Sequence, residues 1–285
     1  MAEIPTVTIT CTSADDGKKV GDILREHGFS RKLITRLKRT QQGITVGGKT
    51  VRTIDRVSAG DEIIICENDL GATLPNSELN VGILFEDEHL IVFDKPPLMP
   101  CHESIKHRGD TLSNFFAAHC PNTVFRCVNR LDRDTSGCVV VAKSAFCANA
   151  LQRSCEKVYF GITEKMSLAG GRVCAPIARE RDSIIKRCVR DDGQYAATVF
   201  SVTQRNGDYA LCRFLLETGR THQIRCHMAH IGCALVGDDM YGSQNTSISR
   251  QALHCGEVTF THPVTKQRLT ITTPLPDDMK NLMQT

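Results

Sequence analysis

The feature that most restricts the fold of this chain is an irregular series of strand-like segments with few helices between them. Apolar or alternating stretches predict strands, and stretches with apolar residues at helical spacing predict helices. The order shows no repeated strand–helix–strand unit, so we expect an α+β domain on a mixed, mostly antiparallel sheet. The expected strands cover residues 83–85, 90–93, 138–142, 158–163, 198–202, 210–216 and 257–260, and the expected helices cover 111–119, 144–154 and 221–231.

The N-terminal part of the chain is basic. Between Lys18 and Arg56 there are eleven Lys and Arg against three Asp and Glu, so this segment carries a formal charge of +8 and the rest carries −5. The pattern predicts a helix over 18–27, a second helix capped by Ser30, a hairpin turning at 47–48 and a last strand over 60–65. A basic helix face suits a phosphate backbone, although a solvated face with no ligand is the alternative. The expected RNA-binding residues are Arg31, Lys32, Arg36, Lys38 and Arg39.

A polar stretch over residues 67–78 contains Gly and Pro and has no periodicity, which is typical of a linker. We place a boundary near residue 75, with a small basic α+β domain over 1–75 and a larger domain over 76–285. The chain has 285 residues and 41% hydrophobic residues, enough for a substantial core.

Residues 130–137, Arg-Leu-Asp-Arg-Asp-Thr-Ser-Gly, place Asp132 between two arginines just before an apolar run. Nearby positive charge, and donors such as the hydroxyl and N–H groups of Thr135 and Ser136, favour the ionised carboxylate. An ionised Asp at the junction of a loop and a strand can act as a nucleophile. A turn with surface ion pairs is the alternative interpretation.

A second segment, residues 217–232, offers this carboxylate a partner. Ile224, Met228 and Ile231 lie at helical spacing, and Gly232 can end the helix. Arg220 then lies in the turn before the helix. We predict that Arg220 forms an ion pair with Asp132; an ion pair of purely structural role is the alternative.

Taken together, these motifs resemble those of pseudouridine synthases of the RluA class. The resemblance rests on Arg130-Leu131-Asp132 with Thr135-Ser136-Gly137, then Lys157-Val158-Tyr159, then residues 219–225, Gly-Arg-Thr-His-Gln-Ile-Arg. It extends from a strand ending in Lys95-Pro96 to Gly237-Asp238, Tyr241-Gly242 and the closing segments, so it covers residue 83 to the end. Motifs in the same order are far less frequent by chance than any one alone. The basic segment resembles, more loosely, the small RNA-binding module named after ribosomal protein S-four.

The resemblance implies a sheet with an RNA cleft along its middle and the isomerisation of uridine to pseudouridine. It implies that Asp132 is the nucleophile, that Tyr159 stacks on the target base and that Arg220 pairs with the nucleophile. Whether Asp132 engages the ribose or the uracil, or first removes a ribose proton, stays open. An enzyme that acts on a base must take it out of the stack. The residues expected to bind the substrate are Arg130, Ile224 and Thr135.

Each of these roles has a plainer alternative. A tyrosine in a strand is commonly a core residue, and Arg130 can serve as a phosphate contact. The sequence also departs from the family pattern at Asn129, where His is common, and at Pro97-Leu98-Met99, where a Gly-containing turn is usual. We expect these departures to affect the shape of the cleft, and hence which uridine is chosen.

Fourteen cysteines are present without any Cys-x-x-Cys spacing, so we expect most to be reduced, buried hydrophobes. A rival interpretation is a metal-dependent hydrolase with a metal site made by His222, Cys226, His227 and His230. We do not favour it, because no carboxylate and no second Cys/His pair lies at a matching spacing. We expect no metal and no cofactor. We expect neither a signal peptide nor a membrane span.

We therefore expect a monomeric, cytoplasmic RNA pseudouridine synthase whose partner is RNA, ribosomal RNA of the large subunit before transfer RNA. Two alternatives remain: a transfer RNA pseudouridine synthase, and an RNA-binding factor that keeps the fold without turnover. The intact set of nucleophile, partner and stacking ring argues against the second.

Overall fold

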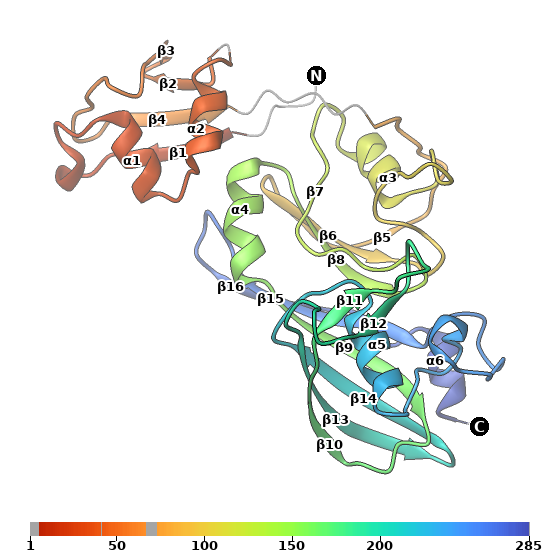
Figure 1. Ribbon diagram of the computed structural model, residues 1–285. Coiled ribbons are helices and arrows are strands. Elements are labelled where there is room, and N and C mark those ends of the chain that lie inside the picture. The colour runs from red at the N-terminus through yellow and green to blue at the C-terminus, as the bar shows by residue number, and fades with distance from the viewer. Residues whose placement is uncertain (1–5, 41, 67–72, 285) are drawn as a thin grey trace.

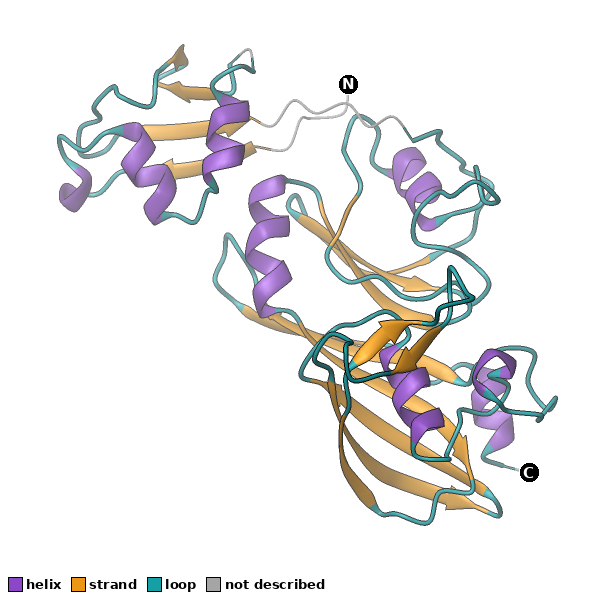
Figure 2. Ribbon diagram, viewed as in Figure 1, coloured by secondary structure: helices purple, strands orange, loops and turns teal. Residues whose placement is uncertain are grey.

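The computed structural model describes residues 6–40, 42–66 and 73–284. Two separate sheets dominate it, a small one near the N-terminus and a large one that follows (Figures 1 and 2). Residues 67–72 of the predicted linker lie outside the described residues. The domain boundary near residue 75 stays a prediction.

The N-terminal module, defined here as residues 6–66, is a four-stranded antiparallel sheet carrying two helices. The hydroxyl of Ser30 accepts a hydrogen bond from the N–H of Leu33, as its predicted N-cap role requires. Gly47 and Gly48 both have positive φ, which is the geometry of a tight hairpin turn. The sheet order is β1-β4-β2-β3, with β1 (Thr6–Thr10), α1 (Val20–Glu26), α2 (Arg31–Leu37), β2 (Ile44–Val46), β3 (Lys49–Thr50) and β4 (Glu62–Cys66).

The large sheet has ten strands in the order β10-β13-β14-β9-β15-β8-β6-β5, with β16 paired to β15 and β7 to β8. All its pairs are antiparallel except β8 with β15. The predicted α+β class with a mostly antiparallel sheet is therefore confirmed. The strands are β5 (Gly82–Glu86), β6 (Leu90–Lys95), β7 (Arg126–Cys127), β8 (Ser136–Ala142), β9 (Glu156–Glu164), β10 (Gly170–Cys174), β13 (Ala197–Asn206), β14 (Tyr209–Leu216), β15 (Leu253–Thr261) and β16 (Arg268–Thr272).

Helices and a hairpin complete the large domain. The hairpin of β11 (Ile177–Arg179) and β12 (Arg187–Val189) forms a separate two-stranded sheet. Each helix and strand predicted for this domain is present, and the short or exposed strands β7, β10, β11, β12 and β16 were not predicted. The helices are α3 (Leu112–His119), α4 (Ala145–Ser154), α5 (Gln223–His230) and α6 (Asp277–Leu282), with a 3-10 turn, η2 (Asp239–Tyr241).

The parallel pairing of β8 with β15 fixes the end of the strand that follows Asp132. Gly137 has φ +110°, and a Cβ atom there would lie 2.2 Å from the carbonyl oxygen of Cys255. Only glycine allows this approach of the two backbones. Beside it, Ser136 Oγ and His254 Nδ1 lie 2.9 Å apart within a hydrogen bond. The loop that carries Asp132 therefore emerges from a closely packed strand junction.

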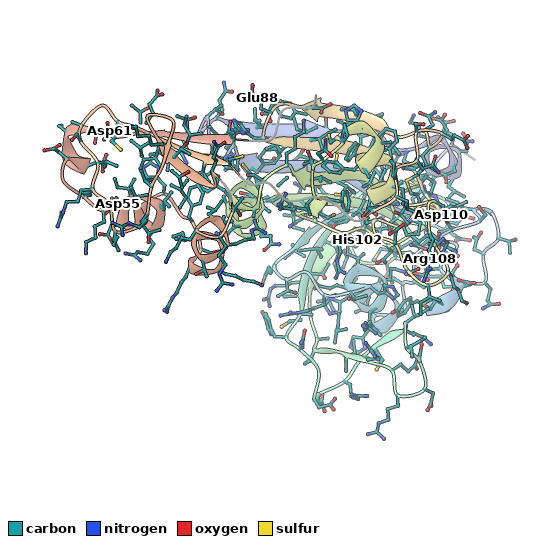
Figure 3. The ribbon with its side chains drawn as sticks, turned by 90° about the horizontal axis from the view of Figure 1, so that it is seen from above. Asp55, Asp61, Glu88, His102, Arg108 and Asp110 are labelled. Atoms are coloured by element: carbon teal, nitrogen blue, oxygen red, sulfur yellow. The ribbon has the colours of Figure 1, made fainter. Side chains whose placement is uncertain are left out.

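The N-terminal module contacts the large domain through α4. The rings of Phe29 and Phe146 stack with centroids 4.5 Å apart. The side-chain amide of Asn149 donates to the carbonyl of Gly28 over 3.2 Å. In the view from above, Asp55 and Asp61 mark the N-terminal module at the left of the picture, and His102 and Arg108 lie in the large domain (Figure 3).

The fourteen cysteines are free thiols, and nine are buried, as expected for small hydrophobes. In the ranges that the structure describes, no helix has both the length and the apolar character needed to cross a membrane.

Candidate active site

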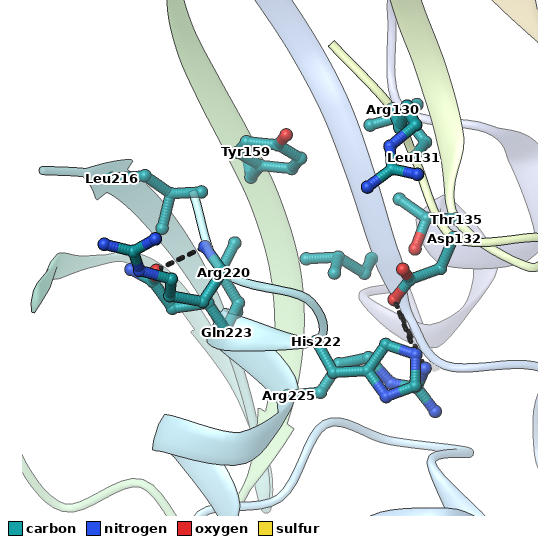
Figure 4. A pocket seen from close by; sticks show the side chains of 12 residues that line it. Arg130, Leu131, Asp132, Thr135, Tyr159, Leu216, Arg220, His222, Gln223 and Arg225 are labelled. Carbon is teal, nitrogen blue, oxygen red and sulfur yellow. Dashed lines mark hydrogen bonds and ion pairs between the residues drawn. The ribbon is translucent and has the colours of Figure 1, made fainter. Parts of the chain in front are cut away.

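Asp132 lies in the loop between β7 and β8, where its side chain keeps 28% of its surface exposed. The N–H of Thr135 donates to the carbonyl of Asp132, closing a turn that leads into β8. The carboxylate faces a pocket of about 60 Å³ (Figure 4). The pocket is lined by Arg130, Leu131, Asp132, Thr135, Tyr159, Leu216, Arg220, His222, Gln223, Ile224, Arg225 and Leu253.

Arg225 holds the carboxylate from behind. Its Nη1 lies 3.2 Å from Oδ2 of Asp132, and its Nε and Nη2 donate to both oxygens of Asp238 over 2.7 and 2.9 Å. Asp238 is fully buried and Arg225 almost so. Burial alone would lower the pKa of Arg225, but the two carboxylates outweigh it and raise that pKa above its ordinary value. The guanidinium is therefore a permanent, fixed positive charge beside Asp132.

The prediction that Arg220 forms this ion pair is wrong. Arg220 lines the pocket but is exposed, and its Nε donates to the carbonyl of Tyr195 over 3.1 Å. The backbone explains why Arg225 contacts Asp132 in place of Arg220. His222 has φ +56°, so the chain turns sharply before α5 begins at Gln223. This turn leaves Arg220 at the rim and brings Arg225, in the first turn of the helix, beneath the carboxylate (Figure 4).

Tyr159 and Ile224, two of the predicted site residues, lie in the wall of the pocket. Tyr159 projects from β9, and both side chains are nearly buried. Burial raises the pKa of Tyr159 well above its usual value, and the charges of Cys255 and Asp132 raise it further. The phenol is therefore protonated near neutral pH, and its ring is available as an apolar surface beside the carboxylate.

The hydroxyl groups after Asp132 have other partners than the expected carboxylate. Thr135 Oγ1 accepts from the amide of Gln251 over 3.2 Å, and Ser136 Oγ bonds to His254. Thr135 is buried but lines the pocket, and Arg130 is exposed at its rim. Thr135 and Arg130 therefore border the pocket, as does Ile224, the third predicted substrate-binding residue, while the two hydroxyls hold the strand junction together.

A cleft of about 1060 Å³ opens from this pocket. Seven pocket residues, Asp132 and Tyr159 among them, also line the cleft. Its walls carry more positive than negative side chains, as a surface for a polyanion requires. The charged side chains are Arg130, Arg133, Lys157, Arg187 and Arg220 against Asp132, Glu156 and Glu217.

A buried lysine supports the Asp132 loop from the other side. Lys95, with no exposed surface, donates through Nζ to the carbonyls of Pro96, Met99 and Arg133 over 2.8, 2.8 and 3.0 Å. Burial lowers the pKa of Lys95 to about 8. The unusual Pro97-Leu98-Met99 turn therefore takes part in this support, with Leu98 in the left-handed region at φ 64°.

Asn129, the other departure from the family pattern, is a structural link. Its Nδ2 donates to the carbonyl of Cys138 and its Oδ1 accepts from the N–H of Val140, over 3.0 and 2.8 Å. Both bonds fasten the segment before Arg130 to β8. Asn129 also borders the cleft.

The histidines of α5 do not assemble as a metal site. His227 bonds through Nδ1 to Thr198 Oγ1 and through Nε2 to the carbonyl of Ala175, which occupies both ring nitrogens. Over the described residues, the one set of potential ligand atoms within 4.8 Å of one another is Glu86, His119 and Cys120. There Lys143 Nζ already lies 2.7 Å from Glu86.

Known proteins resemble this chain in sequence and in fold. Residues 89–230 match the family model described as RNA pseudouridylate synthase. An uncharacterized RNA pseudouridine synthase of Bacillus subtilis, YjbO, is 38% identical over 272 residues, covering 91% of this chain and 96% of that protein. The ribosomal large subunit pseudouridine synthase D of Pseudomonas aeruginosa is 35% identical over 259 residues, covering 82% and 81%.

A solved structure, that of human RNA pseudouridylate synthase domain containing 1, shares the fold with a TM-score of 0.59 and 23% identity. It covers 70% of this chain, which covers 85% of that one. The sequence relatives and the family model together show that the chain belongs to the RluA family of RNA pseudouridine synthases, which are isomerases.

Proposed function

We propose that this protein converts uridine to pseudouridine in large-subunit ribosomal RNA, with Asp132 as the nucleophile. The observation that carries the proposal is the environment of the Asp132 carboxylate. Arg225 contacts Oδ2 of this carboxylate and is itself fixed by the buried Asp238. The carboxylate also lines the pocket at the base of the cleft. A carboxylate oriented in this way is pre-organised for attack.

The reaction is an isomerisation and needs no oxidant and no water. The bond from ribose carbon one to uracil nitrogen one breaks, a bond from the same ribose carbon to uracil carbon five forms, and the proton on carbon five moves to nitrogen one. Asp132 would add to the ribose or to the ring and leave again, or begin by removing a ribose proton. Tyr159 would stack on the base while it turns, because its ring lies in the wall of the same pocket.

RNA binding is proposed for both the cleft and the N-terminal module. The proposed phosphate-binding residues, Arg31, Lys32 and Arg36 of α2 with Lys38 and Arg39 directly after it, are all exposed. The module contacts α4, and Gln152 in the last turns of that helix lines the cleft. A structured RNA would therefore meet positive charge on the module and in the cleft together. Arg130 at the pocket rim would contact the strand from which the uridine is turned out.

The choice of ribosomal RNA follows the names of relatives such as the Pseudomonas aeruginosa protein. Transfer RNA is the second candidate substrate. A monomer is sufficient for the proposed activity, because one chain supplies all the residues of the pocket.

The test is release of tritium from uridine labelled at ring carbon five in unmodified ribosomal and transfer RNA. We expect release from ribosomal RNA by the wild-type protein and none by Asp132→Asn, which keeps the shape of the side chain but removes its charge. Comparable turnover by the variant would remove Asp132 from the nucleophile role. Tight RNA binding without release by the wild type on either RNA would favour a binding factor.

A further inference from the structure

Tyr241 lies behind the pocket and touches two residues that surround Asp132. Its ring lies under the guanidinium of Arg225, with Cζ 5.1 Å from the ring centroid, which is a cation–π contact. It also meets the ring of His222 edge to face at 5.8 Å. Its hydroxyl has two partners: the backbone N–H of Arg187 at 2.9 Å and Nδ1 of His222 at 3.0 Å.

The identity of these partners fixes the direction of the hydrogen bonds. A backbone N–H can only donate, so the phenol oxygen accepts from Arg187. The phenol has one proton, and its remaining partner is Nδ1 of His222. If that proton is donated to Nδ1, the N–H of Arg187, the phenol and Nδ1 are all satisfied, and the ring proton of a neutral His222 must then be on Nε2.

Nε2 is the nitrogen that faces the carboxylate. It lies 3.8 Å from Oδ2 of Asp132, the same oxygen that Arg225 contacts (Figure 4). Burial lowers the pKa of His222; the charges of Arg225 and Arg187 also lower it, while those of Asp132 and Asp238 raise it. His222 is therefore neutral near pH 7, and its tautomer matters because only the form protonated on Nε2 presents a donor to Asp132.

The backbone of His222 indicates that this placement is enforced. Its φ of +56° is in the left-handed region, which is uncommon and strained for a residue with a Cβ atom. Such strain persists where the surroundings over-determine the conformation. Here the strain turns the imidazole between Tyr241 and Asp132.

We propose that Tyr241 is a positioning residue that holds His222 as its Nε2–H tautomer, with this N–H aimed at Oδ2 of Asp132. The inference rests on the proposed function of Asp132. With Arg225 and His222 both directed at Oδ2, the other oxygen, Oδ1, is left to engage the substrate. The contact of 3.8 Å is longer than a hydrogen bond, so the proposal requires it to shorten in the complex with RNA. No proton leaves His222 in this scheme.

The test is a double-mutant cycle with Tyr241→Phe and His222→Asn, measured by single-turnover tritium release and by RNA affinity. Tyr241→Phe keeps the ring under the guanidinium of Arg225 and removes the hydroxyl. His222→Asn suits the left-handed backbone, since Asn adopts it more readily than most residues, but is too short to reach Asp132. Each single variant is expected to lower the rate about tenfold, with RNA affinity within about twofold of wild type.

Because Tyr241 acts through His222, Tyr241→Phe should cost nothing further in the His222→Asn protein. Rate reductions that multiply, or a Tyr241→Phe protein with the wild-type rate, would overturn the proposal. Tyr209→Phe is the matched control, because that hydroxyl bonds to Asn245 over 2.7 Å and Tyr209 lines neither the pocket nor the cleft. The control should retain the wild-type rate.

A second measurement does not depend on activity. Isotope-edited NMR of the ring nitrogens should find His222 protonated on Nε2 in the wild-type protein and a mixture of tautomers in Tyr241→Phe. A wild-type His222 protonated on Nδ1 would refute the inference. If the wild type releases no tritium from any RNA, the proposed function fails, while the tautomer still decides the role of Tyr241.

Discussion

Nη1 of Arg225 lies 3.2 Å from Oδ2 of Asp132, although 93 positions separate the two residues in the sequence. Asp238 accepts two hydrogen bonds from Arg225 and so fixes the guanidinium beside the Asp132 carboxylate. A fixed guanidinium restricts the rotation of the Asp132 carboxylate. This relationship distinguishes the two arginines of the Gly219–Arg225 motif.

Arg225→Lys should reduce the rate of isomerisation by about 100-fold or more, because a lysine cannot contact both oxygens of Asp238 and still reach Asp132. Arg220→Lys should keep the rate within about fivefold of wild type, since its exposed side chain bonds to the Tyr195 carbonyl rather than to Asp132. Single-turnover tritium release measures both. Equal reductions would show that Arg220 has a direct role in the complex with RNA.

Lys95→Met should lower the free energy of unfolding by about 2 to 4 kcal/mol and also slow the reaction. The substitution keeps the volume of the side chain but leaves the carbonyls of Pro96, Met99 and Arg133 without their buried donor. Urea denaturation gives the stability. Lys280→Met is the control, because its ion pair with Asp277 lies at the surface and should contribute little to stability. Equal, small changes in both variants would mean that the carbonyls find water.

Stability should fall as the pH is lowered from 7 toward 5. Burial lowers the pKa of His227 and His254 below the ordinary value of 6.5. As the pH falls below that value, these histidines therefore bind protons in the unfolded chain more readily than in the folded protein, which favours unfolding. The contribution of these two neutral rings to the free energy of unfolding is fully present above pH 6.5 and is lost as the pH falls. Carboxylates with lowered pKa, such as Asp55, lose their contribution only at more acidic pH.

Denaturation at a series of pH values tests this, and His227→Gln should flatten part of the slope because it removes one titrating ring. An unfolding free energy that stays constant between pH 7 and 5 would contradict the prediction.

Replacing the five basic residues of α2 and of the two positions that follow it with glutamine should weaken RNA binding and reduce its salt dependence. Removing one phosphate-binding side chain lowers the slope of log affinity against log salt by about 0.9 for a duplex and about 0.7 for a single strand. Titrations at several salt concentrations give the slope. A matched pair of replacements on the hairpin side of the module, Lys49→Gln with Arg52→Gln, should change it less. An unchanged slope for the α2 variant would assign RNA binding to the cleft alone. The replaced residues are Arg31, Lys32, Arg36, Lys38 and Arg39.

Much of the fold could be predicted from the sequence because its signals are local. Ser30 and Gly47-Gly48 mark the ends of elements through their own backbone preferences, and the structure agrees at each. The strand β1 was not predicted, although its buried and exposed residues alternate. Short strands such as β7 and β12 carry no such pattern, because pairing with distant neighbours decides them.

The site was predictable in its residues but not in its pairings. Asp132, Tyr159 and Ile224 border one pocket, as the motifs indicated. Which arginine contacts Asp132 depends on the left-handed backbone of His222. In a sequence such a backbone is usually marked by glycine, and this position has none. Asp238 stood in a motif of its own, yet its contact with Arg225 arises only when η2 packs against α5.

The parallel junction of β8 and β15 also has a consequence for the order of events in refolding. Ser136 and His254, which meet there, are 118 positions apart, so the junction forms only after nearly the whole large domain has been gathered. The backbone hydrogen bonds within a helix such as α4 join residues only four positions apart. Regained catalytic activity should therefore trail regained helical signal when the denatured protein is diluted into buffer, which makes turnover a reporter of the last contacts to assemble.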